Sequence, residues 1–209
     1  MAEIDKKREQ IIESAIRRFS HFGVQKTTMN EIADDIAVSQ PSLYYYFPDK
    51  TSIIVAVVEK VSNDYFEELE KILAETECLK DIFFQIIEFR RNFVKKFFMM
   101  HLTDSSADAI IRDNCDEILQ ESRLREIKIV AGILNSAIEK GEIAEIDAEN
   151  VSAIYLDSLT GLCMWIISKN QKNIFPESKH WDAMVARQRE LAEIFLKSLK
   201  YKDRSTCKV

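Results

Sequence analysis

Hydrophobic and polar positions along most of the chain repeat with a period close to 3.6 residues, which is typical of amphipathic helices. Between residues 6 and 22, apolar side chains recur every three or four positions, and Gly23 is placed to end that helix. The same spacing predicts longer helices over residues 51–74, 115–140, 148–169 and 179–199. No stretch shows sustained alternation, and the chain has only 4 Gly and 3 Pro. We therefore expect an all-α fold.

Two short helices are predicted between residues 28 and 48. Thr28 and Glu31 form a capping-box pattern that opens the first helix. Ser39 can cap the second helix, and Pro48 ends it. Because a helix of about two turns is not stable by itself in water, packing must hold it in place.

The second short helix turns polar and aromatic side chains away from its packed side. Leu43 and Phe47 lie four residues apart and can pack inward together. The positions that face other directions are Gln40, Ser42, Tyr44 and Tyr45. Gln pairs with adenine edges, hydroxyl groups bond bases or phosphates, and a helix N-terminus attracts phosphate. This pattern favours a nucleic-acid recognition surface.

Fixed spacings connect the residues of this helix pair: Thr27-Thr28, Ile32-Ala33, Val38-Ser39, Leu43-Tyr44 through Phe47, and Lys50. With these spacings, about the first 50 residues resemble the DNA-binding domain of the TetR family of transcriptional regulators. The family usually has Gly in the turn where this chain has Ala37. A left-handed conformation there would cost Ala about 1 kcal/mol. Beyond these residues the resemblance extends only to length and helical character.

The resemblance implies a domain organisation and a set of DNA contacts. An N-terminal three-helix helix-turn-helix domain would span residues 1–50. A larger C-terminal helical domain, for effector binding and dimerisation, would span residues 51–200, and residues 201–209 would form a disordered tail. The expected DNA-binding residues are Thr28, Asn30, Gln40, Pro41, Ser42, Tyr44, Tyr45 and Lys50.

The segment from Leu79 to Met100 is the most aromatic part of the chain. Core packing is the simpler explanation for any single Phe in it. In the resembled family, the middle helices enclose an effector pocket, which assigns the pocket lining to Phe89, Arg90, Phe93, Phe97 and Met100. Arg90 could oppose an anionic group of the effector, although a solvated side chain is the simpler expectation.

The last two predicted helices carry apolar stripes that could complete the core of a monomer. The resembled family instead dimerises by pairing two C-terminal helices of each subunit in a four-helix bundle. This assigns the dimer interface to Tyr155, Ser158, Leu159, Leu162, Leu191 and Phe195. The DNA chemistry also favours a dimer, because two short helices on a two-fold axis read a palindrome with half-sites about 34 Å apart or a multiple of it.

The formal net charge of −6 does not by itself favour nucleic acid, since nucleic-acid binders usually show a basic footprint. We therefore expect the cations of the N-terminal region to lie on the DNA side, namely Lys6, Lys7, Arg8, Lys26 and Lys50. Arg17 and Arg18 are assigned to the solvated face of the first helix, and a phosphate contact is the alternative role.

The cysteines Cys78, Cys115, Cys163 and Cys207 contain no CxxC pair, which favours reduced thiols over disulfides or zinc. The chain also lacks an apolar signal-peptide core and an apolar run of about 20 residues. We therefore expect a cytoplasmic protein that does not contact a membrane.

Together these features predict a ligand-responsive homodimeric transcriptional regulator, which we expect to be a repressor. It would bind a palindromic operator in double-stranded DNA and respond to a small organic effector. An effector-independent DNA-binding structural protein, with a filled middle domain, is the alternative. An enzyme is not expected, because the sequence has no glycine-rich phosphate loop and no nucleophile or acid–base constellation. No cofactor or metal is expected, since His101, Asp104 and Asp108 have no second His or Cys to complete a ligand set.

Overall fold

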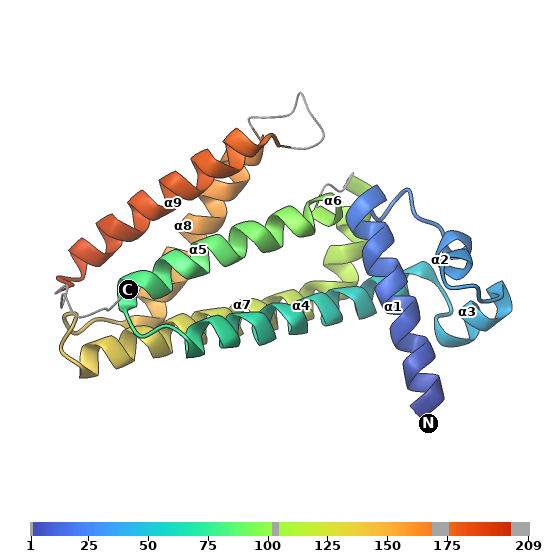
Figure 1. Ribbon diagram of the computed structural model, residues 1–209, viewed down its shortest axis with the longest axis horizontal. Coiled ribbons are helices and arrows are strands. Elements are labelled where there is room, and N and C mark those ends of the chain that lie inside the picture. The colour runs from blue at the N-terminus through green and yellow to red at the C-terminus, as the bar shows by residue number, and fades with distance from the viewer. Residues whose placement is uncertain (1, 102–104, 169–175, 202–209) are drawn as a thin grey trace. The chain divides into compact units, whose positions relative to one another are not determined.

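A computed structural model describes residues 2–101, 105–168 and 176–201 of the chain (Figure 1). All the regular structure within these residues is helical. The helices are α1 (Ala2–Phe22), α2 (Met29–Asp35), α3 (Gln40–Tyr46), α4 (Lys50–Ala74), α5 (Leu79–Lys96), α6 (Phe98–His101), α7 (Ser105–Glu139), α8 (Ala148–Ser168) and α9 (Ser178–Ser198). The predicted all-α fold is thus confirmed.

The helices form two compact units. Unit 1 comprises Met1–Glu67 and Val94–Glu121, and unit 2 comprises Glu68–Phe93 and Ser122–Val209. Helices α4, α5 and α7 each contribute residues to both units. The domain boundaries expected at residues 50 and 200 stay predictions.

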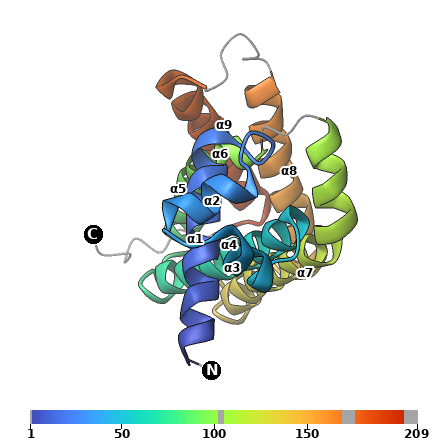
Figure 2. The same cartoon turned by 90° about the vertical axis from the view of Figure 1, so that its right-hand side faces the viewer.

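Unit 1 is built on the apolar stripe of α1, where Ile11, Ala15 and Phe19 are fully buried. Figure 2 shows α2 and α3 beside α1, and α2 packs against both of the other two helices. The buried side chains of these short helices and of the start of α4 complete one hydrophobic core: Met29, Ile32, Ala33, Leu43, Phe47, Ile53, Ile54, Ala56 and Val57. This core holds α3 in place, as its short length requires.

Unit 2 contains an aromatic cluster contributed by three helices. The ring of Tyr155 in α8 lies 4.8 Å from that of Phe83 in α5 and 4.9 Å from that of Phe195 in α9, measured between centroids. Helix α9 also bonds directly to α8, because Gln188 Nε2 donates to the carbonyl oxygen of Leu159 at 2.8 Å.

The helices after α4 refine the picture drawn from the sequence. The aromatic segment 79–100 contains α5, which ends at Lys96, and most of α6, which begins at Phe98. The polar run at residues 103–108 favours a connection before a helix that starts near Cys115. Helix α7 begins instead at Ser105, so residues 105–108 open this helix. Polar residues that can cap a helix can equally form its first turn, and the sequence alone did not distinguish these cases. Residues 103 and 104 of that expected connection lie outside the described residues.

The cysteines also differ from expectation. Cys115 and Cys163 are free, but Cys78 is part of a disulfide bond. Cysteine spacing could not show this, because a disulfide depends on proximity in three dimensions. In the part of the chain that the structure describes, no helix has both the length and the apolar character needed to cross a membrane.

Candidate nucleic-acid interface

Helix α2 begins with the predicted capping box. The backbone N–H of Thr28 donates to Glu31 Oε2 at 2.7 Å, and the backbone N–H of Glu31 donates to Thr28 Oγ1 at 3.3 Å. The hydrogen bonds from Thr28, and then the charge of Arg18, lower the pKa of the Glu31 carboxyl. The Thr28 and Asn30 side chains remain exposed at this end of α2.

The turn between α2 and α3 has the left-handed backbone that the family pattern implies. Ala37 has a φ of 52°, a value that a residue with a Cβ adopts only at a cost. Two hydrogen bonds close the turn, from Ala37 N to Asp34 O at 3.1 Å and from Val38 N to Ala33 O at 3.0 Å.

Helix α3 has one buried side and one exposed side. Ser39 caps it by accepting a hydrogen bond from the backbone N–H of Ser42. Leu43 and Phe47 are 0% and 3% exposed, whereas Tyr44 and Tyr45 are 46% and 74% exposed. Gln40 and Pro41 are also exposed, and Ser42 is half-buried. The structure thus gathers the outward side chains expected for DNA recognition on one short, firmly packed helix.

Arg18 has a role that the sequence did not indicate. Its guanidinium donates two hydrogen bonds of 2.7 Å to Asp35 and lies 3.1 Å from Glu31. It also lies over the Phe22 ring, 5.6 Å from the centroid. Arg18 therefore joins α1 to α2, and its assignment to a solvated face was wrong, because carboxylates far away in sequence come to face it.

The Lys50 side chain is less available for a phosphate contact than expected. Its ammonium donates to the carbonyl oxygen of Gln25 at 3.3 Å, and burial lowers the pKa of its amine. An ammonium has three donors, so this bond leaves capacity for a phosphate oxygen.

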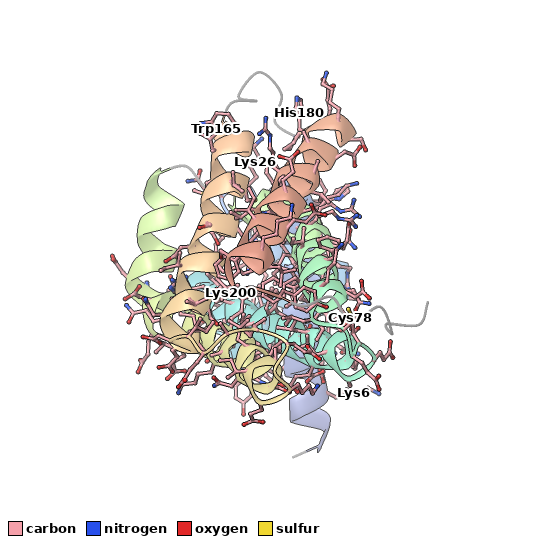
Figure 3. The ribbon with its side chains drawn as sticks, turned by 90° about the vertical axis from the view of Figure 1, so that its left-hand side faces the viewer. Lys6, Lys26, Cys78, Trp165, His180 and Lys200 are labelled. Atoms are coloured by element: carbon pink, nitrogen blue, oxygen red, sulfur yellow. The ribbon has the colours of Figure 1, made fainter. Side chains whose placement is uncertain are left out.

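The other expected cations of unit 1 are spread along α1. Lys6 lies near the N-terminal end of α1 and Lys26 just beyond the other end (Figure 3). Both are exposed, and Lys7 is half-buried. The guanidinium of Arg8 lies over the Phe47 ring, 5.2 Å from the centroid.

The residues expected to line an effector pocket are divided between the two units. Phe89, Arg90 and Phe93 belong to unit 2, whereas Phe97 and Met100 belong to unit 1, where Met100 packs against the core. The rings of Phe89 and Phe93 lie 6.2 Å apart. Arg90 was expected to be solvated, but it is bonded to Glu126 and donates to Thr160 Oγ1 at 3.0 Å.

Two of the expected dimer-interface residues need correction. Tyr155 and Leu159 are each 1% exposed, buried by other residues of the same chain. They cannot add apolar surface to an interface because they have none left to bury. Ser158, Leu162, Leu191 and Phe195 are half-buried. The exposed apolar side chains on these helices are instead Ile154, Met164, Trp165 and Ile194, which a period of 3.6 residues could not separate from the buried stripe.

The described residues contain no group of three or more His, Cys, Asp or Glu side chains placed to hold a metal ion. Unit 2 contains two buried polar atoms that lack a hydrogen-bond partner among the described residues. These atoms are the Tyr155 hydroxyl and Gln188 Oε1. Burial raises the pKa of the Tyr155 hydroxyl above its ordinary value.

Residues 11–57 match the family model described as "Bacterial regulatory proteins, tetR family". Over 52 residues, covering 25% of this chain and 24% of the relative, the sequence is 44% identical to the "Probable acrEF/envCD operon repressor" of Escherichia coli K12. The match therefore centres on the segment that contains α2 and α3.

Solved structures extend the likeness to nearly the whole chain. A transcriptional regulator from Cytophaga hutchinsonii superimposes with a TM-score of 0.79 at 28% identity, covering 92% of this chain and 98% of its own. A regulator from Saccharomonospora viridis, solved in complex with choline, has the same fold, with a TM-score of 0.67 at 16% identity over 92% of this chain and 96% of its own. Residues 11–57 thus carry the DNA-binding segment of the TetR family of bacterial regulatory proteins, and the described chain shares the fold of solved transcriptional regulators.

Proposed function

We propose that the protein is a homodimeric repressor, which binds a palindromic operator through α3 and releases it when a small organic molecule binds in unit 2. The observation that carries the proposal is the division of α3 into two sides. Leu43 and Phe47 fix the helix to the core, while Tyr44 and Tyr45 project from it. Large aromatic side chains are costly to expose without a partner, and base edges in a major groove offer one.

The proposed DNA contacts fall into two groups. Gln40, Ser42, Tyr44 and Tyr45 would contact bases or adjacent phosphates, and Thr28, Lys50 and the amide groups at helix starts would hold the phosphate backbone. Asn30 and Pro41 belong to the same proposed DNA-binding surface. The chain carries a net charge of −6, so the local cations must supply the attraction to DNA. We expect binding to weaken as salt rises, with a slope set by the few phosphates contacted.

Repression is supported by the relative that shares the DNA-binding segment, which is described as an operon repressor. A dimer is supported by α8, which exposes Ile154 and Trp165 together with Gly161 between them. A Cβ added at Gly161 would meet nothing within 4 Å, so the helix surface is open to a second helix there.

The effector site is proposed in unit 2, around the buried Tyr155 hydroxyl and Gln188 Oε1. A buried polar atom without a partner is destabilising by about 1–3 kcal/mol. A small organic molecule with one hydrogen-bond donor and one acceptor could satisfy both atoms, and the half-buried Phe89, Arg90 and Phe93 would contribute from α5. The choline complex of the related fold supports a small organic molecule as the class of effector. For a near-complete switch, the effector would have to bind the state released from DNA roughly 10⁴-fold more tightly than the DNA-binding state.

The first test replaces Tyr44 by Ala. The operator is first selected from a random-sequence duplex library with the wild-type protein, and affinity is then measured by gel shift. We expect specific binding to be lost, because each base contact removed costs roughly 1–3 kcal/mol of discrimination. Circular dichroism should show an unchanged fold, since Tyr44 is not part of the core.

A matched control is Leu124→Ala, which removes an exposed apolar side chain in unit 2, far along the chain from α3. It should bind the operator as the wild type does. Operator affinity unchanged by Tyr44→Ala would contradict the proposed recognition surface.

A further inference from the structure

The two unpaired polar atoms of unit 2 lie in its packed interior. Tyr155 and Gln188 are 1% and 3% exposed, and neither the Tyr155 hydroxyl nor Gln188 Oε1 has a hydrogen-bond partner among the described residues. The Tyr155 ring lies 4.8 Å from the Phe83 ring and 4.9 Å from the Phe195 ring, measured between centroids. Because apolar rings do not satisfy these atoms, the arrangement implies a partner from outside the polypeptide.

Both atoms belong to the same level of α8, which packs against α9 (Figure 1). Gln188 is fixed there through its amide, since Nε2 donates to the carbonyl oxygen of Leu159 at 2.8 Å. Burial raises the pKa of the Tyr155 hydroxyl and the charge of Arg90 opposes that rise, so the guanidinium lies near the hydroxyl. Arg90 in turn donates to Thr160 Oγ1, one residue after Leu159. We therefore expect one small group between α5, α8 and α9 to reach both atoms.

The hydrogen-bonding requirements of the two atoms are complementary. Gln188 Oε1 only accepts, whereas the Tyr155 O–H has a hydrogen to donate. The hydroxyl group of a ligand fits both, because it carries one donor and an acceptor oxygen. Water would bring a second O–H that neither atom satisfies, a carboxylate has no donor for Gln188, and an ammonium has no acceptor for Tyr155. The pair of atoms is therefore suited to a single hydroxyl group.

The charges beside these atoms disfavour an ionic ligand. The Arg90 guanidinium is bonded to the Glu126 carboxylate, and both side chains are largely buried. An added anion or cation would have to replace one member of this pair, and an unpaired charge in the interior is strongly unfavourable. An uncharged ligand leaves the pair intact.

We propose that the effector is an uncharged hydroxyl compound, an alcohol or a phenol with an apolar body. Its hydroxyl oxygen accepts a hydrogen bond from the Tyr155 hydroxyl, its O–H donates to Gln188 Oε1, and its body packs against the aromatic cluster. This inference rests on the effector site of the proposed function and adds the chemical class of the molecule that binds there.

Four fluorinated probes that share one ring test this class: para-fluorophenol, fluorobenzene, para-fluorobenzoate and para-fluorobenzylammonium. Their dissociation constants from the full-length protein are measured at neutral pH by ¹⁹F NMR titration. We expect para-fluorophenol to bind the wild-type protein and the two ions to show no binding. Preferential binding of either ion would overturn the proposal. So would a lack of binding by para-fluorophenol, which would leave water as the partner of the two atoms.

Tyr155→Phe removes the hydroxyl and keeps the ring in the aromatic cluster. The measured quantity is the dissociation constant of fluorobenzene divided by that of para-fluorophenol, because comparing this ratio between variant and wild type cancels the hydration of each probe. We expect the ratio to fall roughly tenfold, since one buried hydrogen bond is lost. Gln188→Met, which removes the acceptor, should lower the same ratio.

The matched control is Tyr65→Phe, which removes the hydroxyl of a half-buried tyrosine in unit 1 and should leave the ratio unchanged. A melting curve followed by circular dichroism checks the fold of each variant. Tyr155→Phe should melt no lower than the wild type, because its lost hydroxyl has no partner in the ligand-free protein. A ratio that stays the same in Tyr155→Phe as in the wild type would exclude the proposed hydrogen bond.

Operator release separates this inference from the proposed function. Operator affinity is measured by gel shift with and without saturating para-fluorophenol. If the probe binds with the expected dependence on Tyr155 while the operator stays bound, the hydroxyl-binding site stands and release by the effector fails. If a charged molecule releases the operator equally from the wild type and from Tyr155→Phe, ligand control stands and the hydroxyl class is overturned.

Discussion

At the scale of single residues, the most informative position is Ala37, in the turn between α2 and α3. Its φ of 52° lies in the left-handed region, which Gly adopts without the clash that a Cβ causes. The turn is held by two backbone hydrogen bonds, and the packed helices on either side fix its path. The strain at Ala37 is therefore sustained by the core of unit 1.

Ala37→Gly should stabilise the protein. Relief of the left-handed strain is worth about 1 kcal/mol, and the larger entropy of Gly in the unfolded chain offsets part of it. Urea denaturation followed by circular dichroism measures the difference in the free energy of unfolding.

The control for this change is Ala183→Gly, at an exposed position inside α9. There Gly should destabilise by up to about 1 kcal/mol, because it weakens a regular helix. If Ala37→Gly destabilised the protein as much as the control does, the strain attributed to Ala37 would be absent.

At the scale of secondary-structure elements, the Arg18 contact decides how α1 and α2 are joined. Its hydrogen bonds hold the pKa of the Asp35 carboxyl below its ordinary value. A carboxyl with a lowered pKa in the folded protein contributes stability above its unfolded pKa. That contribution is lost as the pH falls through the folded pKa.

Asp35→Asn should therefore lower the melting temperature at pH 7 by a few degrees. The difference from wild type should shrink below about pH 4, where Asp carboxyls of the unfolded chain begin to take up a proton, and vanish below the lowered pKa of the folded protein. The neighbouring Asp34→Asn, at an exposed position of the same helix, serves as the control and should change little. A difference for Asp35→Asn that persists undiminished in acid would show that the charge of Asp35 does not stabilise the contact. Scanning calorimetry from pH 2 to pH 7 gives both curves.

The sequence predicted elements well where local chemistry determines them. The Thr28 cap, the Ser39 cap and the inward pair Leu43 and Phe47 were all visible, because capping and helical spacing depend only on neighbours along the chain. Arg18 was not visible, since its carboxylate partners lie 13 and 17 residues away. The same limit explains Tyr155 and Leu159, because helical periodicity shows which stripe is apolar and not which partner covers it.

At the scale of the whole molecule, the main feature is an exposed apolar stripe on α8. Ile154, Gly161 and Trp165 lie along one exposed stripe of this helix, and we attribute that stripe to the proposed dimer. Gly161 permits close approach of a second helix, because it has no side chain to hold the backbones apart.

Gly161→Arg should convert the proposed dimer to a monomer without unfolding the protein. A Cβ at position 161 meets nothing within 4 Å in the monomer, so the change is free of clashes there. Arg also has a higher helix propensity than Gly, which should slightly raise the stability of the helix itself. Size-exclusion chromatography with light scattering measures the mass.

The matched control is Gly132→Arg in α7, at the other exposed helical glycine with nothing within 4 Å of its added Cβ. It makes the same change of residue and of charge at a position outside α8, and it should leave the protein dimeric. A Gly161→Arg protein that remains a dimer of unchanged affinity would exclude the α8 stripe as the interface.

The two sides of α3 separate what keeps the protein folded from what its surface can bind. Leu43 and Phe47 contribute to the core, while the outward positions of the helix contribute almost nothing to it. Substitutions at these outward positions should therefore alter the preferred DNA sequence with little change in the free energy of unfolding. Such a scaffold tolerates sequence divergence, because duplicated copies could acquire new target sites through a few surface changes. A combinatorial library at Gln40, Ser42, Tyr44 and Tyr45 should therefore yield mostly folded proteins.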